Sequence, residues 1–465
     1  MLTIPHLRSQ TSALPFLPKL EDLFTSPRQQ LAWIHGEDGF VAAGTAARKD
    51  YTPASSDSST ARFEALTQWW QALEDDAEVR DEVRTIGTGL LAFGSFSFAP
   101  HSPAGSSLIV PQVLVGRRQG KAWLTIIGPI DDDVFNTLAP EAQALLDAVL
   151  KREHQEYGEF TVDSVEEIPD VLEWQAQVER ASQTIRAGEA DKIVLSRTLA
   201  LHTSTQIDER QILSRLHQKY PSTWIFAIDG LIGASPEMLA ASAAIIDDSP
   251  LSGTEGNKVF ARVLAGTLPI QQNSDPATGS SLSHNAYSHA ELDEKSRLLT
   301  ASEKDQLEHQ VAVESVVSTL TKVGKVETSG TFVLTLPNVL HLATDVVADL
   351  FDSSSIIDIA GLLHPTAALG GSPKDAVLEI IDTIEVTDRD RYGAPVGWIS
   401  SGNFGQWCVA LRCARIDSNN TARAWAGGGI MGDSVPSIEL AETEAKFEPV
   451  MDAFQITDFY DSTRK

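Results

Sequence analysis

The chain has 465 residues, 42% hydrophobic and 22% charged, an ordinary globular composition that allows one large domain or two to three smaller ones. Its net charge of −28 argues against nucleic acid or an anionic membrane as the main partner. There is no apolar run of 18 residues, no signal-like apolar stretch at the start, and no Cys-x-x-Cys spacing between Cys408 and Cys413. We therefore expect a reduced, cytoplasmic protein without a membrane span.

Residues 1–160 alternate between strand-like and helix-like patterns and carry no catalytic motif. Short apolar, β-branched runs predict strands, and apolar periods of 3.6 residues predict helices. The predicted strands cover 39–44, 107–115 and 122–128, and the predicted helices cover 62–73 and 141–150. The acidic, proline-containing stretch 158–170 is typical of a connector.

The C-terminal part begins with a helix whose apolar stripe runs from Trp174 to Ile185 and ends at Gly188. Residues 271–290 are polar without a period and predict a mobile loop. Later strands are predicted at 192–200, 224–228, 396–399, 406–415 and 422–426, and later helices at 301–322 and 437–454. Many strands mixed with helices, without strict alternation, favour an α+β fold with a large, mostly antiparallel sheet.

Two acidic helical segments each carry a pair of carboxylates three residues apart, which places each pair on one helix face. Asp305 and Glu308 form the first pair, and Glu439 and Glu442 form the second. If the two faces meet, they create an oxygen-rich pocket that suits Mg²⁺ and an anionic substrate. The alternative is that both faces are simply solvated, and the pattern alone leaves both open.

Three charged residues lie among apolar neighbours. Lys192 is the first residue of an apolar strand. It is either an anchor in solvent or a lysine in a closed pocket that acts as a base. Glu237 follows a proline in a turn. It is either a carboxylate at the start of a helix or a buried carboxyl that serves as an acid. Arg412, on a predicted strand, needs an anionic partner. The stretch 427–432 fits G-x-G-x-x-G, but no βαβ unit follows, so we interpret it as a glycine-rich turn presenting N–H groups to a carboxylate.

Nine motifs occur along the chain in the order of one enzyme family. They are Lys192–Arg197, Gly233–Glu237, Leu264–Thr267, Ala301–His309, His341–Thr344, His364–Gly371, Leu411–Arg415, Ala426–Ile430 and Glu439-x-x-Glu442-x-x-x-Lys446. Over residues 170–455 the chain resembles the chorismate-utilising (anthranilate synthase component I-like) family, and its isochorismate synthases most. The resemblance implies a single large α+β domain of two stacked, mostly antiparallel sheets with helices outside. Residues 1–160 would be a scaffold part of that domain, and 170–455 the chorismate-binding catalytic region.

The resemblance also implies roles by position within these motifs. Lys192 is implied to be the base that activates water, and Glu237 the acid at the departing hydroxyl. Mg²⁺ is implied to be held by Glu308 and Glu442, with Asp305 and Glu439 nearby. Chorismate is implied to contact Gly266, Thr267, His341, Tyr392, Arg412, Gly427 and Lys446.

The reaction implied is the conversion of chorismate to isochorismate, for menaquinone or siderophore biosynthesis. Chorismate is the one partner expected, with no nucleic acid or membrane, and we expect a monomer or weak dimer. Salicylate synthases share the lysine at position 192 and also eliminate pyruvate, so they remain an alternative. Ammonia-using members lack this lysine or carry one at the position of Ala265, and a degenerate binding protein would have lost Mg²⁺ dependence.

The chain departs from the family pattern between Glu237 and Glu308, where it is longer than usual. Residues 250–254 are a rival for the Leu-Ala-Gly-Thr motif, but the strand-like lead-in at 258–263 favours 264–267. Leu268 and Pro269 stand where the family often has an arginine, which leaves the contacts to the substrate ring open.

Overall fold

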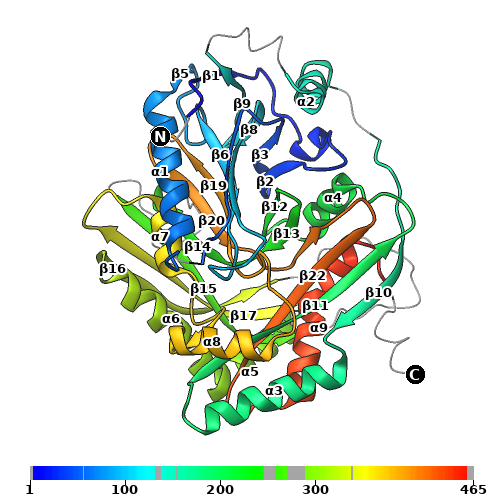
Figure 1. Ribbon diagram of the computed structural model, residues 1–465, viewed down its shortest axis with the longest axis vertical. Coiled ribbons are helices and arrows are strands. Elements are labelled where there is room, and N and C mark those ends of the chain that lie inside the picture. The colour runs from blue at the N-terminus through cyan, green and yellow to red at the C-terminus, as the bar shows by residue number, and fades with distance from the viewer. Residues whose placement is uncertain are drawn as a thin grey trace.

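The computed structural model describes residues 4–55, 57–130, 138–152, 156–245, 257–269, 289–336 and 339–457. Within these ranges the chain forms two large sheets surrounded by helices (Figure 1). None of the described helices is long and apolar enough to cross a membrane. The expected α+β domain with two large, mostly antiparallel sheets is confirmed.

The larger sheet, sheet A, has 13 strands within the described residues. In spatial order they are β10 (Val162–Ile168), β11 (Lys192–Thr203), β22 (Thr421–Ile430), β21 (Cys413–Ile416), β13 (Leu231–Ser235), β12 (Trp224–Ile228), β2 (Leu31–His35), β3 (Asp38–Ala43), β8 (Val113–Arg118), β9 (Lys121–Pro129), β1 (Leu7–Ala13) and β5 (Glu78–Asp81), with β18 (Gly371–Ser372) beside β11. Among these described strands only β1 and β5 pair in parallel. Strand β2 pairs with β12, which joins the N-terminal part of the chain to its middle within this sheet.

The smaller sheet, sheet B, has nine strands within the same ranges. In spatial order they are β16 (Gly324–Thr335), β17 (Val339–Leu350), β15 (Lys258–Pro269), β14 (Met238–Ser242), β20 (Phe404–Val409), β19 (Pro395–Ser400), β6 (Leu91–Ser95), β7 (Ser106–Val110) and β4 (Ala47–Tyr51). Here β6 pairs with β19, which again joins an early strand to a late one.

Helices lie around the sheets, and the predicted helical periods are confirmed with small changes at their ends. They are α1 (Ala61–Asp76), α2 (Pro140–Lys151), α3 (Val171–Arg186), α4 (Glu209–Lys219), α5 (His289–Ala301), α6 (Glu303–Leu320), α7 (Ile356–Leu363), α8 (Lys374–Ile384) and α9 (Pro436–Ala453). Short 3₁₀ turns cover Leu20–Leu23 and Ala243–Ile245.

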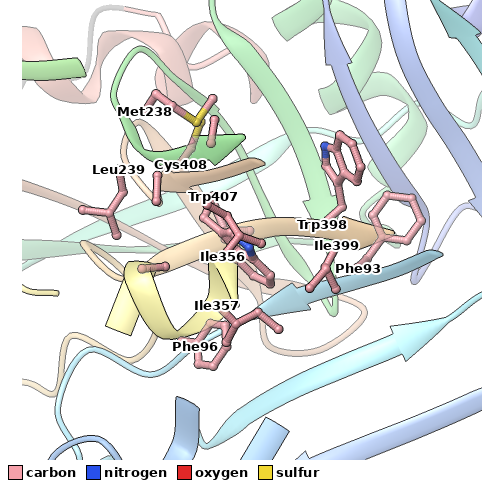
Figure 2. Packing of buried hydrophobic residues seen from close by; sticks show 14 of the residues in the cluster. Phe93, Phe96, Met238, Leu239, Ile356, Ile357, Trp398, Ile399, Trp407 and Cys408 are labelled. Carbon is pink, nitrogen blue, oxygen red and sulfur yellow. The ribbon is translucent and has the colours of Figure 1, made fainter. Parts of the chain in front are cut away.

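Aromatic side chains fill the space between the two sheets. Phe40 of β3 lies edge-on to Trp398 of β19 and Phe93 of β6, with ring centroids 4.9 and 6.4 Å apart. Trp33 of β2 donates a hydrogen bond to Gln406 Oε1 of β20 at 2.9 Å. Figure 2 shows Trp398 and Phe93 within this cluster, together with residues of β14, β20 and α7. The core therefore joins sheet A to sheet B, as stacked sheets require.

A second group of buried residues fixes α9 against the strands that carry predicted site residues. Trp174 and Val178 of α3 pack in one cluster with Ile193 of β11, Ile430 of β22 and Leu440 of α9. This cluster uses the stripe predicted for the helix at Trp174. As a result, the carboxylates of α9 are held next to the start of β11.

Two strands predicted as continuous are each divided between the sheets, which corrects the expectation. The predicted strand 107–115 breaks at Pro111 into β7 of sheet B and β8 of sheet A. Proline cannot donate a hydrogen bond to a strand ladder, which favours a break there. The predicted strand 406–415 breaks at residues 410–412 into β20 and β21, so the free, buried Cys408 and Cys413 lie on different sheets.

Three further expectations change. The predicted connector 158–170 contains β10, an edge strand paired with β11. The glycine stretch predicted as a turn lies largely in β22, because residues 427–430 pair with β11. The predicted loop 271–290 and the rival motif 250–254 lie outside the described residues, apart from 289–290, which begin α5.

Candidate active site

Lys192 begins β11, and its side chain is fully buried. Its Nζ lies 2.9 Å from Glu308 Oε1 on α6. Burial favours the neutral form of Glu308. The opposing charge of Lys192, supported by Lys446 and Lys304, nevertheless holds the pKa of this carboxyl below its usual range. The structure thus pairs the predicted base with one of the predicted metal ligands.

Glycines on β22 make room for this pair. A Cβ atom at Gly429 would lie 2.5 Å from Glu308 Oε1 and 2.8 Å from Lys192 Cε. A Cβ atom at Gly428 would lie 3.5 Å from Glu439 Oε2, which is an ordinary contact. The bare backbone of β22 therefore lets side chains from β11, α6 and α9 lie close to this strand.

Helix α9 carries two carboxylates and one lysine into the same region. Lys446 Nζ lies 2.6 Å from Glu442 Oε1 and donates to the carbonyl of Gly427 at 2.9 Å. Glu439 is fully buried, and burial first, then Glu442, raises its pKa. Its Oε1 accepts from Ser434 Oγ at 2.6 Å, whereas its Oε2 has no hydrogen-bond partner among the described residues.

Lys304 lies between the two acidic helices. Its Nζ is 2.9 Å from Glu439 Oε1. Burial opposes its charge, yet Glu439, Glu442 and Glu308 together hold the pKa of Lys304 above its ordinary value. The predicted meeting of the two acidic faces is therefore observed, but with lysine ammonium groups between the carboxylates. In the part of the chain that the structure describes, no three His, Cys, Asp or Glu side chains form a metal-holding group.

Asp305 lies at the start of α6, where its N–H donates to the Oγ of Ser302, the N-cap residue, at 3.3 Å. Burial raises the pKa of its carboxyl, which also accepts from the backbone of Thr267. Gly266 faces Asp305 at an irregularity of β15, and its φ of +76° is a conformation that glycine adopts readily. A Cβ atom there would lie 3.0 Å from Asp305 Cβ. These contacts support 264–267 as the family motif.

Glu237 lies where the chain crosses from β13 of sheet A to β14 of sheet B. It is buried, and burial raises the pKa of its carboxyl to about 8, against the opposing charges of Arg412, Lys192 and Lys446. No helix begins here in the described chain, so the helix-start interpretation is wrong. A carboxyl in this setting is largely protonated at neutral pH and can donate a proton.

Arg412 lies at the reverse crossing, from β20 to β21, with a left-handed φ of +49°. Its Nη2 is 3.3 Å from His341 Nε2, and His341 Nδ1 is 3.1 Å from Thr267 Oγ1. Burial first, then Arg412, holds the pKa of His341 well below its ordinary value, so the imidazole is neutral. Tyr392 is buried, and its hydroxyl oxygen lies 3.2 Å from the position of a Cβ atom at Gly427.

Comparison with known proteins identifies the family of this chain. The sequence profile of the family described as "Chorismate binding enzyme" matches residues 6–455. The chain belongs to this family. It is 29% identical to isochorismate synthase MenF of Bacillus subtilis (strain 168) over 418 residues, which cover 84% of this chain and 81% of that protein. It is 28% identical to isochorismate synthase EntC of Escherichia coli (strain K12) over 423 residues, which cover 89% and 92%.

A solved structure, the menaquinone-specific isochorismate synthase MenF from Escherichia coli, shares the fold of this chorismate-binding enzyme. The TM-score is 0.74 at 22% sequence identity, with 97% of this chain and 95% of that chain covered. The resemblance inferred from the nine motifs is therefore confirmed.

Two residues of this chorismate-binding enzyme contact the predicted site without having been predicted. Lys304 and Ser434 both bind Glu439. Lys304 lies inside the motif 301–309, and its position one residue before Asp305 was the available signal. Ser434 lies in the short turn after β22, where nothing in the pattern marks it.

Proposed function

We propose that this chorismate-binding enzyme converts chorismate to isochorismate. The observation that carries the proposal is a buried lysine, Lys192, whose charge acts on a buried, largely protonated carboxyl, Glu237. Water addition at C2 of the ring needs a base, and departure of the C4 hydroxyl as water needs an acid. As the ring double bonds shift between these two events, no atom is gained or lost overall.

In this proposal Lys192 takes a proton from the attacking water, and Glu237 gives one to the leaving hydroxyl. Each such group contributes about 10²–10⁴-fold to a rate. A lysine needs its lone pair to act as a base, so the contact between Lys192 and Glu308 must open before water is activated. Glu237 is in the donating form below about pH 8.

Chorismate is a dianion, and the chain around it carries a net charge of −28. We assign Arg412 and Lys446, with the backbone of Gly427 and the adjacent Tyr392, to the pyruvyl carboxylate. The ring carboxylate is assigned to the backbone of 266–267, with His341 lining the site. Supporting this, buried cations attract carboxylates more strongly than exposed ones do.

We also propose that Mg²⁺ is held by Glu308 and Glu442, with Asp305 and Glu439 nearby. The donor set fits this ion, which prefers carboxylate oxygens and an anionic substrate. The buried Glu439 Oε2 without a hydrogen-bond partner is the kind of atom that a cation or water satisfies. When bound, the ion neutralises and orients the ring carboxylate.

The test is incubation of the purified protein with chorismate and Mg²⁺, without ammonium, followed by chromatographic separation of the products. We expect isochorismate at equilibrium with chorismate, and loss of turnover in Lys192→Gln while its far-UV circular dichroism spectrum shows the wild-type fold. Turnover that starts only after ammonium is added would contradict the proposal. Release of salicylate and pyruvate would identify a salicylate synthase instead. If isochorismate is the product, feeding it to the next enzyme of the menaquinone or siderophore pathway would distinguish the two pathways.

A further inference from the structure

The candidate active site contains three lysine–carboxylate pairs. Lys192 pairs with Glu308, Lys304 pairs with Glu439 and Lys446 pairs with Glu442, at distances of 2.9, 2.9 and 2.6 Å. Together with Asp305, these are the four carboxylates to which we assign the metal. Without a metal, three ammonium groups therefore balance most of the negative charge of this cluster.

The three lysines differ in how easily their side chains can move away from the carboxylates. The side chain of Lys192 is 0% exposed and that of Lys446 is 13% exposed, whereas that of Lys304 is 33% exposed. Lys446 is also tied to the carbonyl of Gly427. Lys304 lies in the first turn of α6, and its four-carbon stem allows the ammonium to turn out into water. Of these three lysines, Lys304 is the most exposed to solvent.

We propose that Lys304 is the resident counter-cation of the metal-free site and that a divalent metal displaces it. This inference rests on the Mg²⁺ site of the proposed function. Lys304 Nζ occupies the space beside Glu439 Oε1, and the charges of Glu442 and Glu308 also act on it. A metal drawn to the same carboxylates meets the positive charge of Lys304, so the two cations repel each other.

The charge count agrees with displacement. With Lys304 in place, a divalent ion would leave the four carboxylates and three lysines with an excess positive charge. With Lys304 turned outward, the four carboxylates balance Lys192, Lys446 and the ion. In the metal-free protein, Lys304 protects the fully buried Glu439, because a buried carboxylate without a cation is strongly destabilising.

Lys304 is thus a residue that lowers metal affinity while stabilising the metal-free protein. The test is calorimetric titration of MgCl₂ into metal-stripped protein, combined with melting temperatures with and without Mg²⁺. We expect Lys304→Met to bind Mg²⁺ about tenfold more tightly than the wild type. Its metal-free melting temperature should be lower, and the increase caused by Mg²⁺ should be larger.

Two variants serve as controls. Lys304→Arg keeps the charge and should retain wild-type affinity. Lys322→Met makes the same change in net charge at an exposed position just past the far end of α6, about 27 Å away at 1.5 Å per residue, and should leave affinity unchanged. Equal tightening in Lys322→Met would mean that net charge alone is responsible, which overturns the inference.

The remaining outcomes separate this inference from the proposed function. If the wild type binds Mg²⁺ and Lys304→Met binds it equally or more weakly, Lys304 does not compete with the metal and only the inference fails. If neither protein binds Mg²⁺, the proposed metal site fails and the inference fails with it. If Mg²⁺ binds to Lys304→Met alone, competition by the lysine is supported.

Discussion

The acidity of Glu237 is decided by a contest between burial and neighbouring charge. Arg412, Lys192 and Lys446 each favour its ionised form, but burial outweighs them, and the pKa rises from an ordinary 4.5 to about 8. The position of Glu237 at a crossing between sheets is what removes it from water. A carboxyl that keeps its proton at neutral pH suits a general acid.

We predict that Glu237→Gln, which keeps the shape but cannot give up a proton, lowers kcat by about 10²–10⁴-fold. In the wild type, the rate should fall as pH rises through about 8, because the carboxyl then loses the proton it must donate. The variant should lack this decline. Steady-state rates of isochorismate formation between pH 6 and 9.5 measure both effects.

The matched control is Glu379→Gln on the exposed face of α8, which should behave as the wild type does.

The pH dependence of stability gives a second check with a defined sign. The contribution of Glu237 is fully present below pH 4.5 and is lost as pH rises through about 8, since the unfolded chain releases the proton first. Glu237→Gln should remove that slope, and an unchanged pH–rate profile in this variant would refute the acid role.

Individual site residues could be predicted from the sequence because motif order fixes their identity. The structure brings residues from different motifs together, as the contact between Lys192 and Glu308 shows. Their partners could not be predicted, because the contact of Lys304 with Glu439 joins positions 135 residues apart on two helices. Which cation faces which carboxylate depends on packing between α6 and α9, and no local pattern records it.

At the scale of elements, the absence of side chains at the glycines of β22 shapes the candidate site. Gly428 and Gly429 are adjacent on this strand, yet a side chain at each would meet different surroundings. At Gly429 the nearest atoms are Glu308 Oε1 at 2.5 Å and Lys192 Cε at 2.8 Å, both closer than real Cβ contacts. At Gly428 the nearest atoms are 3.5 Å away or further.

We predict that Gly429→Ala reduces turnover at least about 10²-fold, because the new methyl group displaces the proposed base. Gly428→Ala is the matched control and should keep most of the activity. Far-UV circular dichroism should show that both variants fold. Equal activity of the two variants would mean that the close approach at Gly429 does not position the site.

The limits of strands were less predictable than their existence. Apolar residues occur throughout 107–115 and 406–415, although the chain changes sheets within each segment. Buried strands on either side of such a crossing are both apolar, so the apolar pattern cannot show which sheet follows. The crossing within 406–415 places Arg412 between the sheets, and a separate crossing from β13 to β14 places Glu237 there. Their burial was therefore also beyond the pattern.

At the scale of the whole molecule, the aromatic layer between the sheets holds the structure together. Phe40 contacts side chains of both sheets, among them Trp123 of β9 at 6.1 Å and Trp398 of β19 at 4.9 Å. We predict that Phe40→Ala lowers the free energy of unfolding by about 3–5 kcal/mol, through lost burial and the cavity left behind. Denaturant unfolding followed by tryptophan fluorescence measures this.

The control is Phe351→Ala, at a side chain that is 72% exposed, which should change stability by less than about 0.5 kcal/mol. Similar losses in both variants would show that the layer between the sheets does not dominate stability. The two-sheet architecture itself was predictable from the family motifs, whereas the aromatic contacts between early and late strands were not.

The place of β22 between β11 and β21 also sets the order in which the protein can be made. During synthesis, β11 leaves the ribosome long before residues 421–430 do. The edge of β11 that pairs with β22 therefore stays unpaired until the end of the chain is made. Pairings across such sequence distances form slowly, and unpaired edges invite aggregation in the meantime. The last strand of sheet A thus completes the candidate active site and ends the interval in which the nascent chain is most vulnerable.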